Sequence, residues 1–172
     1  STIRDIRAYI LDLRPHQLHD DNLMQSVHRL VSEFRANTNV DVTLQGPQDG
    51  LAELGDVQSI ALFHICQESL ANIAKHARAS HVRISLRRES DAGSIELDIE
   101  DDGVGHDAAS VRAGLGWLGM KERASMLGGE LTIGQSRLGG VLVRCRVPPA
   151  AHHPLAPHIY TDTEMATEEE NR

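Results

Sequence analysis

The stretch QESLANIAKHA, residues 67–77, lies in a run that carries two rows of side chains at helical spacing. Both rows repeat every three or four positions, which predicts one long helix over about residues 56–76. The apolar row is Leu62, Cys66, Leu70, Ile73 and Ala77, and the polar row is His64, Glu68, Asn72 and His76. Ala61 and Ile65 border the polar row, so its side chains are enclosed by apolar ones, as in one wall of a pocket.

Two helices and a short strand are predicted before this helix. Residues 2–13 carry a narrow apolar seam, typical of a coiled coil, and Pro15 ends it. A second helix is predicted from Asp20, with Asp20 or Asp21 as its N-cap and acids in its first turn. Its apolar stripe is Leu23, Val27, Leu30, Val31 and Phe34, and the strand alternates at Val40, Val42 and Leu44.

The residues after the long helix predict a β-hairpin, with a turn at residues 91–93. Its strands alternate at Val82, Ile84 and Leu86 and at Ile95, Leu97 and Ile99. By the period of two, Asp101 falls on the same face as these last three residues. The sequence therefore predicts a carboxylate that points inward at the end of a strand.

Residues 103–119 contain five glycines, which predicts a mobile lid. The lid leads into a helix that runs to Leu127 and that Gly128 and Gly129 terminate. Two last strands are predicted at residues 131–133 and 141–147. Beyond Pro148 the sequence is polar and acidic, and we expect a disordered tail.

Composition limits the classes of function. The chain has 172 residues and 40% hydrophobic content, enough for one domain with appendages. Its formal net charge of −8 argues against non-specific nucleic-acid binding. No apolar run approaches the roughly 20 residues that cross a bilayer, so we expect no direct membrane contact. Cys66 and Cys145 lie in apolar segments, which indicates buried free thiols and a cytoplasmic location.

Three segments carry candidate chemistry, and each alone has an ordinary alternative. Glu68 and Asn72 offer oxygen atoms one helical turn apart, which suits a hydrated Mg²⁺, and Lys75 adds a positive charge for phosphates; an isolated pair of this kind is usually a solvated helix face. Asp101 offers an acceptor for the exocyclic amine of adenine, although a lone DxGxG is usually a tight turn. The third segment, around residues 114–120, offers free backbone N–H groups at a helix start, where phosphate is favoured; a flexible hinge explains its glycines equally well.

The three segments, in this order, resemble the motifs of a known family. QESLANIAKHA, DDGVG and GLGWLGMKERASMLGG are similar to the N box, first glycine box and second glycine box of the catalytic ATP-binding domain of sensor histidine kinases. That domain belongs to a superfamily with gyrase-type topoisomerases, heat-shock chaperones and mismatch-repair ATPases. IRAYILDLRPHQL, the KHA ending and GMKERASMLGG resemble the nitrate-sensor-like kinases, and the likeness covers residues 2–148.

The resemblance implies a fold and a division of the chain. The fold is an α/β two-layer sandwich of the Bergerat type, a mixed sheet with helices on one face and a glycine-rich ATP lid. Residues 1–15 correspond to the end of the second helix of a dimerisation hairpin, residues 16–148 to the catalytic domain, and residues 149–172 to the tail.

It also implies roles for individual residues, with ATP and Mg²⁺ as cofactors. Asn72 ligates Mg²⁺, and Glu68 positions a water near the metal or the γ-phosphate. Asp101 accepts a hydrogen bond from the adenine amine. Lys75 and His76 face the phosphates, Gly103 and Gly105 shape the adenine end, and the lid and phosphate cradle consist of Gly114, Gly116, Leu118, Gly119 and Met120.

The sequence departs from the family pattern at two places. Trp117 stands where a smaller aliphatic residue is common, so an indole either packs the lid or hinders it. The last glycine turn, residues 138–141, is one residue short of the usual pattern, so we assign no nucleotide contact there and expect weaker binding.

The implied activity is phosphoryl transfer from ATP to a histidine on a dimerisation hairpin, which forms a homodimer in the full-length kinase, and then to an aspartate of a response regulator. The first hairpin helix is missing here, and membrane anchoring of the parent kinase is left open. His19 lies in an LHD triplet like that of the phosphoacceptor box, but its position after LRP indicates a helix entrance instead. Two alternatives are a free-standing ATPase or anti-sigma-type serine kinase of the same superfamily, and a degenerate interaction domain.

Overall fold

The computed structural model describes residues 22–48, 51, 54–90, 93–105 and 115–149. The predicted helix at residues 2–13, His19 and the tail from residue 150 onward lie outside the described residues. Three α-helices, a π-helical segment and five strands make up the described part. They are α2 (Leu23–Asn37), α3 (Asp56–Asn72), η2 (Ile73–Ala77), α5 (Leu115–Met126), β1 (Asp41–Gln45), β2 (His81–Arg88), β3 (Ile95–Asp101), β4 (Glu130–Gln135) and β5 (Val141–Val147).

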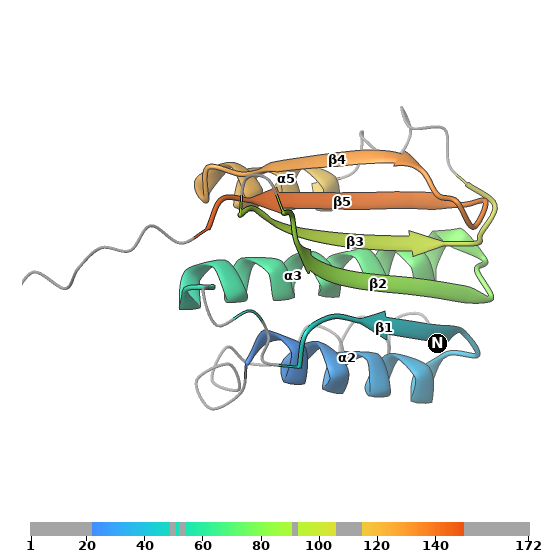
Figure 1. Cartoon of the computed structure of the whole chain (residues 1–172). Helices are drawn as coiled ribbons and strands as arrows, with labels where there is room; N and C mark the ends of the chain where they lie inside the picture. Colours follow the sequence, from blue (N-terminus) through green and yellow to red (C-terminus); the bar gives the residue numbers. More distant parts are fainter. Residues whose placement is uncertain (1–21, 49–50, 52–53, 91–92, 106–114, 150–172) are drawn as a thin grey trace, which may run out of the picture.

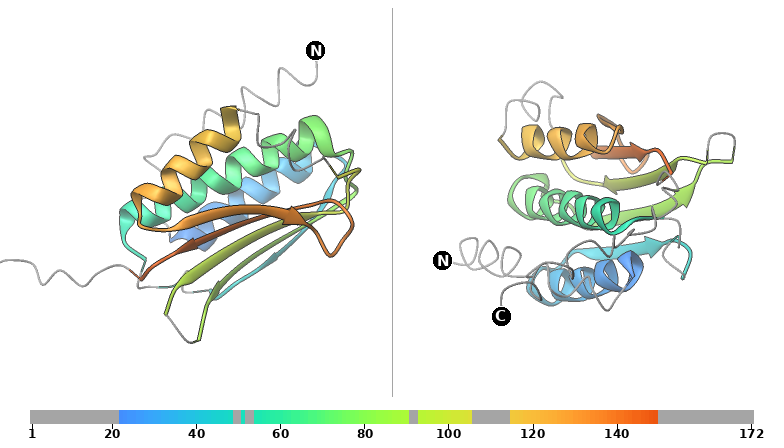
Figure 2. Two further views of the ribbon diagram at one scale, coloured as in Figure 1. Left: turned by 90° about the horizontal axis from the view of Figure 1, so that it is seen from above. Right: turned by 90° about the vertical axis from the view of Figure 1, so that its left-hand side faces the viewer.

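The strands form one mixed sheet in the order β1-β2-β3-β5-β4 (Figure 1). β1 pairs with β2 in parallel, and the other neighbouring strands pair antiparallel. Figure 2 shows that α2, α3 and α5 all lie on one face of the sheet, with α3 between the other two. The predicted two-layer α/β sandwich with a mixed sheet is therefore confirmed.

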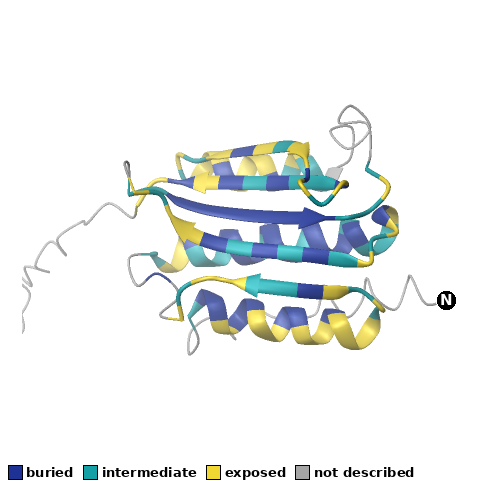
Figure 3. Cartoon of the chain, turned by 45° about the vertical axis from the view of Figure 1, so that its right-hand side comes forward, coloured by how far each residue is buried: buried dark blue, intermediate teal, exposed yellow. Residues whose placement is uncertain are grey.

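The buried residues lie between these layers. The apolar stripe of α2 and the apolar row from Leu62 to Ala77 are buried, as the periodicity predicts. β3 is buried over its whole length, whereas its neighbours alternate (Figure 3). Cys66 and Cys145 are free and buried, which confirms the expected free thiols. Burial raises the pKa of both thiols to about 12, so they stay protonated and unreactive at neutral pH.

The start of α2 differs from the prediction. Asn22 is the N-cap: its side chain accepts a hydrogen bond from the Gln25 backbone N at 3.0 Å, and the Gln25 side chain accepts one from the Asn22 N at 3.0 Å. The N-cap prediction for Asp20 or Asp21, and the prediction of acids in the first turn, are wrong. The reason is the capping box, which needs a Glu or Gln three residues after the N-cap. The residue three positions after Asp20 is Leu23, and the residue three positions after Asp21 is Met24.

The long helix also differs at its end. It is α-helical to Asn72 and then widens into the π-helical turn η2, which ends at Arg78 in the left-handed conformation, with φ of 51°. π-turns inside helices are rare and are frequent at functional sites. No helix within the described ranges combines the length and the apolar character needed to cross a membrane.

Candidate nucleotide-binding site

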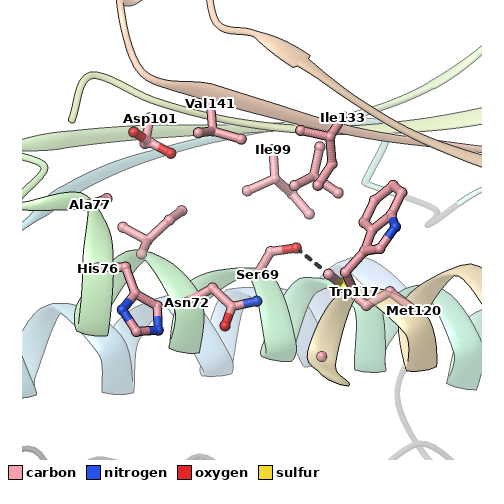
Figure 4. A pocket seen from close by; sticks show the side chains of 13 residues that line it. Ser69, Asn72, His76, Ala77, Ile99, Asp101, Trp117, Met120, Ile133 and Val141 are labelled. Atoms are coloured by element: carbon pink, nitrogen blue, oxygen red, sulfur yellow. Dashed lines mark hydrogen bonds between the residues drawn. The ribbon is translucent and has the colours of Figure 1, made fainter. Parts of the chain in front are cut away.

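A cavity of about 280 Å³ lies between the helices and the sheet. Figure 4 shows α3 and η2 along one side, the strands opposite and the first turns of α5 at one end. Its size is close to the lower limit of small-molecule pockets, roughly 300 Å³. The residues that line it are Ser69, Asn72, Ile73, His76, Ala77, Ile99, Asp101, Gly116, Trp117, Met120, Ile133, Val141 and Val143.

Asp101 lies at one end of the cavity, beside Ile99, as the period of two predicts. Its Oδ1 accepts a hydrogen bond from the Gly103 backbone N at 2.8 Å. Its own backbone oxygen accepts one from the Gly140 N at 3.0 Å. A Cβ on Gly140 would lie 2.0 Å from Oδ1 of Asp101, so only glycine fits at that position. The last glycine turn, to which the sequence analysis assigned no nucleotide contact, therefore packs directly against this carboxylate.

The first glycine box also contacts η2. The Val104 N donates a hydrogen bond to the Ala77 oxygen at 2.9 Å. A Cβ on Gly103 would lie 2.2 Å from the same oxygen. Gly105, with φ of 61°, continues the turn. Gly103 and Gly105 do not line the cavity. Gly103 and the Val104 N–H join the end of β3 to the end of the long helix and so hold Asp101 in place.

Asp102 points away from the cavity, in contrast to its neighbour. It accepts hydrogen bonds from the Ser80 backbone N at 2.8 Å, from the Ser80 hydroxyl at 2.5 Å and from the His81 N at 2.9 Å. The Ser80 hydroxyl and then the backbone N–H groups hold the pKa of this carboxyl below its ordinary value. Asp102 therefore connects β2 to β3 and takes no part in the pocket.

The polar row of the long helix is divided by the structure. Asn72 and His76 line the cavity, and Ser69 joins them. Glu68 is half-buried beside the lid helix, where a Cβ on Gly116 would lie 2.1 Å from its Oε1. His64, Glu68 and Lys75 are not among the lining residues.

Only the end of the predicted lid is described. Gly114 lies outside the described residues, together with the rest of residues 106–114. Gly116 and Met120 line the cavity, and the Ser69 hydroxyl donates a hydrogen bond to the Met120 sulfur at 3.6 Å. Leu118 is 51% exposed, and a Cβ on Gly119 would meet open space. Neither Leu118 nor Gly119 contributes to the cavity in this arrangement.

Several lining residues were not predicted from the sequence as site residues. Strand alternation predicted Ile133, Val141 and Val143 as strand residues, but it does not indicate which buried positions face an empty space. Ser69 lies between the two rows of the helix, so neither row included it. Trp117 was noticed only as a departure from a pattern.

The cavity suits a planar ring that carries an amine. Its walls are mostly apolar, and Asp101 supplies an acceptor at one end. Among the described residues, no group of three or more His, Cys, Asp or Glu could hold a metal ion. A Mg²⁺ at Asn72 would therefore take most of its ligands from phosphate and water, as this ion commonly does. The amide oxygen of Asn72 fits that arrangement.

Comparison with known proteins supports an ATP site. Residues 57–151 match the family described as histidine kinase-, DNA gyrase B- and HSP90-like ATPases. An uncharacterized sensor-like histidine kinase of Chloroflexus aurantiacus is 34% identical over 151 residues, 84% of this chain and 25% of that protein. The histidine-protein kinase/phosphatase UhpB of Salmonella typhimurium is 38% identical over 128 residues, 74% of this chain and 25% of that protein. The chain thus spans about a quarter of the length of these relatives.

A solved structure has the same fold. The crystal structure of the ATP-binding domain of PrrB from Mycobacterium tuberculosis superposes with a TM-score of 0.61 and 25% identity, and the likeness covers 75% of this chain and 95% of that one. The histidine kinase domain of the blue-light activated kinase of Erythrobacter litoralis EL346 has a TM-score of 0.63 at 21% identity, a likeness of fold alone. Together with the cavity, these findings confirm the resemblance in the sequence: the chain belongs to the family of histidine kinase-, DNA gyrase B- and HSP90-like ATPases, and its relatives are sensor histidine kinases.

Proposed function

We propose that this chain is the ATP-binding catalytic part of a sensor histidine kinase. The observation that carries the proposal is the position of Asp101, a buried carboxylate at the end of an apolar cavity that Asn72 also lines. The chain's relatives are sensor histidine kinases, which favours this proposal over a free-standing ATPase or a serine kinase.

Asp101 binds the adenine end of ATP. Its carboxylate accepts a hydrogen bond from the exocyclic amine, while Ile99, Val141 and Val143 contact the ring faces. The Gly103 N–H and the Gly140 turn fix the carboxylate before the nucleotide arrives. A preformed acceptor in an apolar site loses little on binding and rejects a base that lacks the amine.

The phosphates extend from this end past Asn72. Asn72 supplies an oxygen to Mg²⁺, and phosphate oxygens and water complete its shell. Glu68 positions a water near the metal or the γ-phosphate, and Lys75 and His76 offset the phosphate charge. The lid and phosphate cradle consist of Gly114, Gly116, Leu118, Gly119 and Met120.

The reaction is a transfer of the γ-phosphoryl group. The bond between the γ-phosphorus and the bridging oxygen breaks, a bond from phosphorus to an imidazole nitrogen forms, and ADP leaves. The histidine belongs to a dimerisation hairpin of the parent kinase, of which residues 1–15 are the end, and a response-regulator aspartate receives the group next. Residues 16–148 are the catalytic domain, and the site works in the cytoplasm.

Nucleotide binding tests this proposal. A fluorescent ATP analogue is titrated with Mg²⁺ into the wild type and into Asp101→Asn, and we expect the variant to bind at least about 100-fold more weakly, because a hydrogen bond to a charged acceptor is lost in a buried site. The matched control is Asp102→Asn, since this neighbouring carboxyl contacts Ser80 and His81 and not the cavity. We expect it to bind like the wild type.

A second measurement tests the transfer itself. The chain and Mg-ATP are mixed with a dimerisation hairpin of a relative, and acid-labile phosphate on the hairpin histidine is the expected product.

In the titration, negligible binding of the fluorescent ATP analogue by both the wild type and Asp101→Asn would refute the proposal.

A further inference from the structure

We propose that Trp117 makes the site selective for a two-ring base by closing the cavity at the end opposite Asp101. This inference rests on the proposed function and adds to it a specificity-determining residue. A carboxylate that accepts from an exocyclic amine cannot by itself distinguish adenine from cytosine, because both bases carry such an amine beside a ring nitrogen. A second contact at a set distance from Asp101 is needed to exclude the single-ring base.

Figure 4 shows this second contact. Asp101 and Val141 lie at one end of the cavity, and the indole of Trp117 rises from α5 toward Ile133 at the other end. The indole is half-buried and packs against the core. Met120, on the next turn of the same helix, is buried and supports that end of the cavity.

The strand register gives the separation of the two ends. Ile99 pairs with Val143, and Val143 pairs with Ile133, so Ile133 lies two strands across the sheet from Ile99. Asp101 lies two residues further along β3. With strands about 4.8 Å apart and about 3.4 Å per residue, Asp101 and Ile133 are about 12 Å apart between Cα atoms.

The long helix gives a similar, slightly smaller value. Ser69 contacts Met120 at the indole end, and Ala77 contacts Val104 at the carboxylate end. Eight residues separate Ser69 from Ala77, which is at most about 12 Å at the α-helical rise of 1.5 Å per residue, and the π-helical turn η2 shortens this distance because it is wider and rises less per residue. Side chains from both ends fill part of that distance, so a fused two-ring base bonded to Asp101 reaches the indole, whereas a single ring leaves an apolar gap.

Contact with the indole stabilises the longer base. An aromatic face or edge against a base adds dispersion and stacking energy, whereas a gap too small for water forfeits it. Trp117 therefore favours ATP over CTP. A tryptophan that merely filled the core would affect the binding of the two nucleotides equally.

The test is a comparison of ATP and CTP affinities. Calorimetric titration of Mg-ATP and Mg-CTP gives the ratio of their dissociation constants for the wild type, Trp117→Leu and Trp117→Phe. We expect Trp117→Leu to weaken ATP binding about tenfold and to change CTP binding less than about twofold. The preference for ATP over CTP, given by the ratio of the two dissociation constants, should therefore fall. The ratio for Trp117→Phe should lie between the two, because its ring reaches less far.

The matched control is Met126→Leu, on the same helix but 86% exposed, and it should leave both affinities unchanged. Circular dichroism confirms that each variant is folded, and Trp117→Phe keeps the comparison available if the leucine variant is not. An ATP/CTP ratio equal to that of the wild type in the folded variants would overturn the inference while leaving ATP binding established. Failure of wild type to bind ATP would instead refute the proposed function.

The wild-type protein offers a second readout, because Trp117 is the only tryptophan of the chain. Its emission should change on saturation with Mg-ATP but not with Mg-tripolyphosphate, which carries the phosphates without a base. An equal change with both ligands would show that the indole senses the phosphates rather than the base, which contradicts the inference.

Discussion

The two faces of β3 carry acids of the same kind in different surroundings. On the face away from the helices, Glu96, Asp98 and Glu100 are buried, and arginines of the flanking strands cover them. Arg144 binds Asp98 through two hydrogen bonds of 2.7 and 2.8 Å, which raise the pKa of its guanidinium.

On the face toward the helices, Asp101 accepts a hydrogen bond from the Gly103 backbone N–H and borders a cavity. The outer acids thus receive hydrogen bonds from arginine side chains that join β2, β3 and β5, and Glu100 accepts one more from the Arg137 backbone N. Asp101 is held by glycine turns and leaves room for a ligand. The comparison teaches that a cavity beside a buried acid, rather than burial alone, separates a structural carboxylate from one suited to binding.

The largest expected effect concerns the outer face. Glu96→Ala removes the acid that Arg87, Arg144 and Arg146 share. We expect the free energy of unfolding to fall by about 2 kcal/mol, less than for a fully buried pair, because these arginines are 31–51% exposed and can be hydrated. Urea unfolding measures this fall.

ATP affinity should stay within about twofold of the wild type in Glu96→Ala, since a stability loss of this size leaves the protein folded. Glu130→Ala, at an exposed position of the edge strand β4, is the control and should lower the free energy of unfolding by less than about 0.5 kcal/mol. A large loss of ATP binding in Glu96→Ala would show that the two faces are not independent.

A smaller effect is expected from the turn that supports Asp101. In Gly140→Ala the new Cβ would meet the Asp101 carboxylate at 2.0 Å and its backbone oxygen at 2.7 Å, so the carboxylate must move. We expect ATP affinity to fall about tenfold, or about 1.4 kcal/mol, because the acceptor leaves its bonding position. Gly134→Ala, where a Cβ meets nothing within 4 Å, is the control for adding a methyl group to this pair of strands. Equal ATP affinity for the two variants would show that Asp101 does not need this glycine.

Local patterns in the sequence predicted one side of the comparison and missed much of the other. The inward position of Asp101 follows from the period of two along a single strand. The partners of the outer acids do not, because Arg144 is 46 residues from Asp98 in sequence and Arg146 is 50 from Glu96. Only the order of the strands brings these residues together.

The same limit explains what was missed at the site. The contact between Gly140 and Asp101 joins residues far apart in the chain. Neither the sequence around Gly140 nor the sequence around Asp101 indicates this contact. The Ala77 oxygen, at the end of the π-helical turn, accepts a hydrogen bond from the Val104 N–H, and helix periodicity does not predict this contact. In contrast, Asn22 was predictable in principle, since its partner Gln25 lies three residues away.

The smallest effect distinguishes the two adjacent acids at the end of β3, Asp101 and Asp102. The pKa of Asp102 in the folded state lies below its ordinary value of 3.8, mainly because of the Ser80 hydroxyl. Its contribution to stability is therefore complete above the unfolded pKa and is lost as the pH falls through the folded pKa. The wild type should lose stability as the pH falls below about 3.8, the unfolded value, and Asp102→Asn should show a shallower loss below that pH. Urea unfolding at several pH values measures both slopes. Parallel slopes would mean that the Ser80 and His81 hydrogen bonds do not favour the charged form, and Asp102 would then differ from Asp101 in position alone.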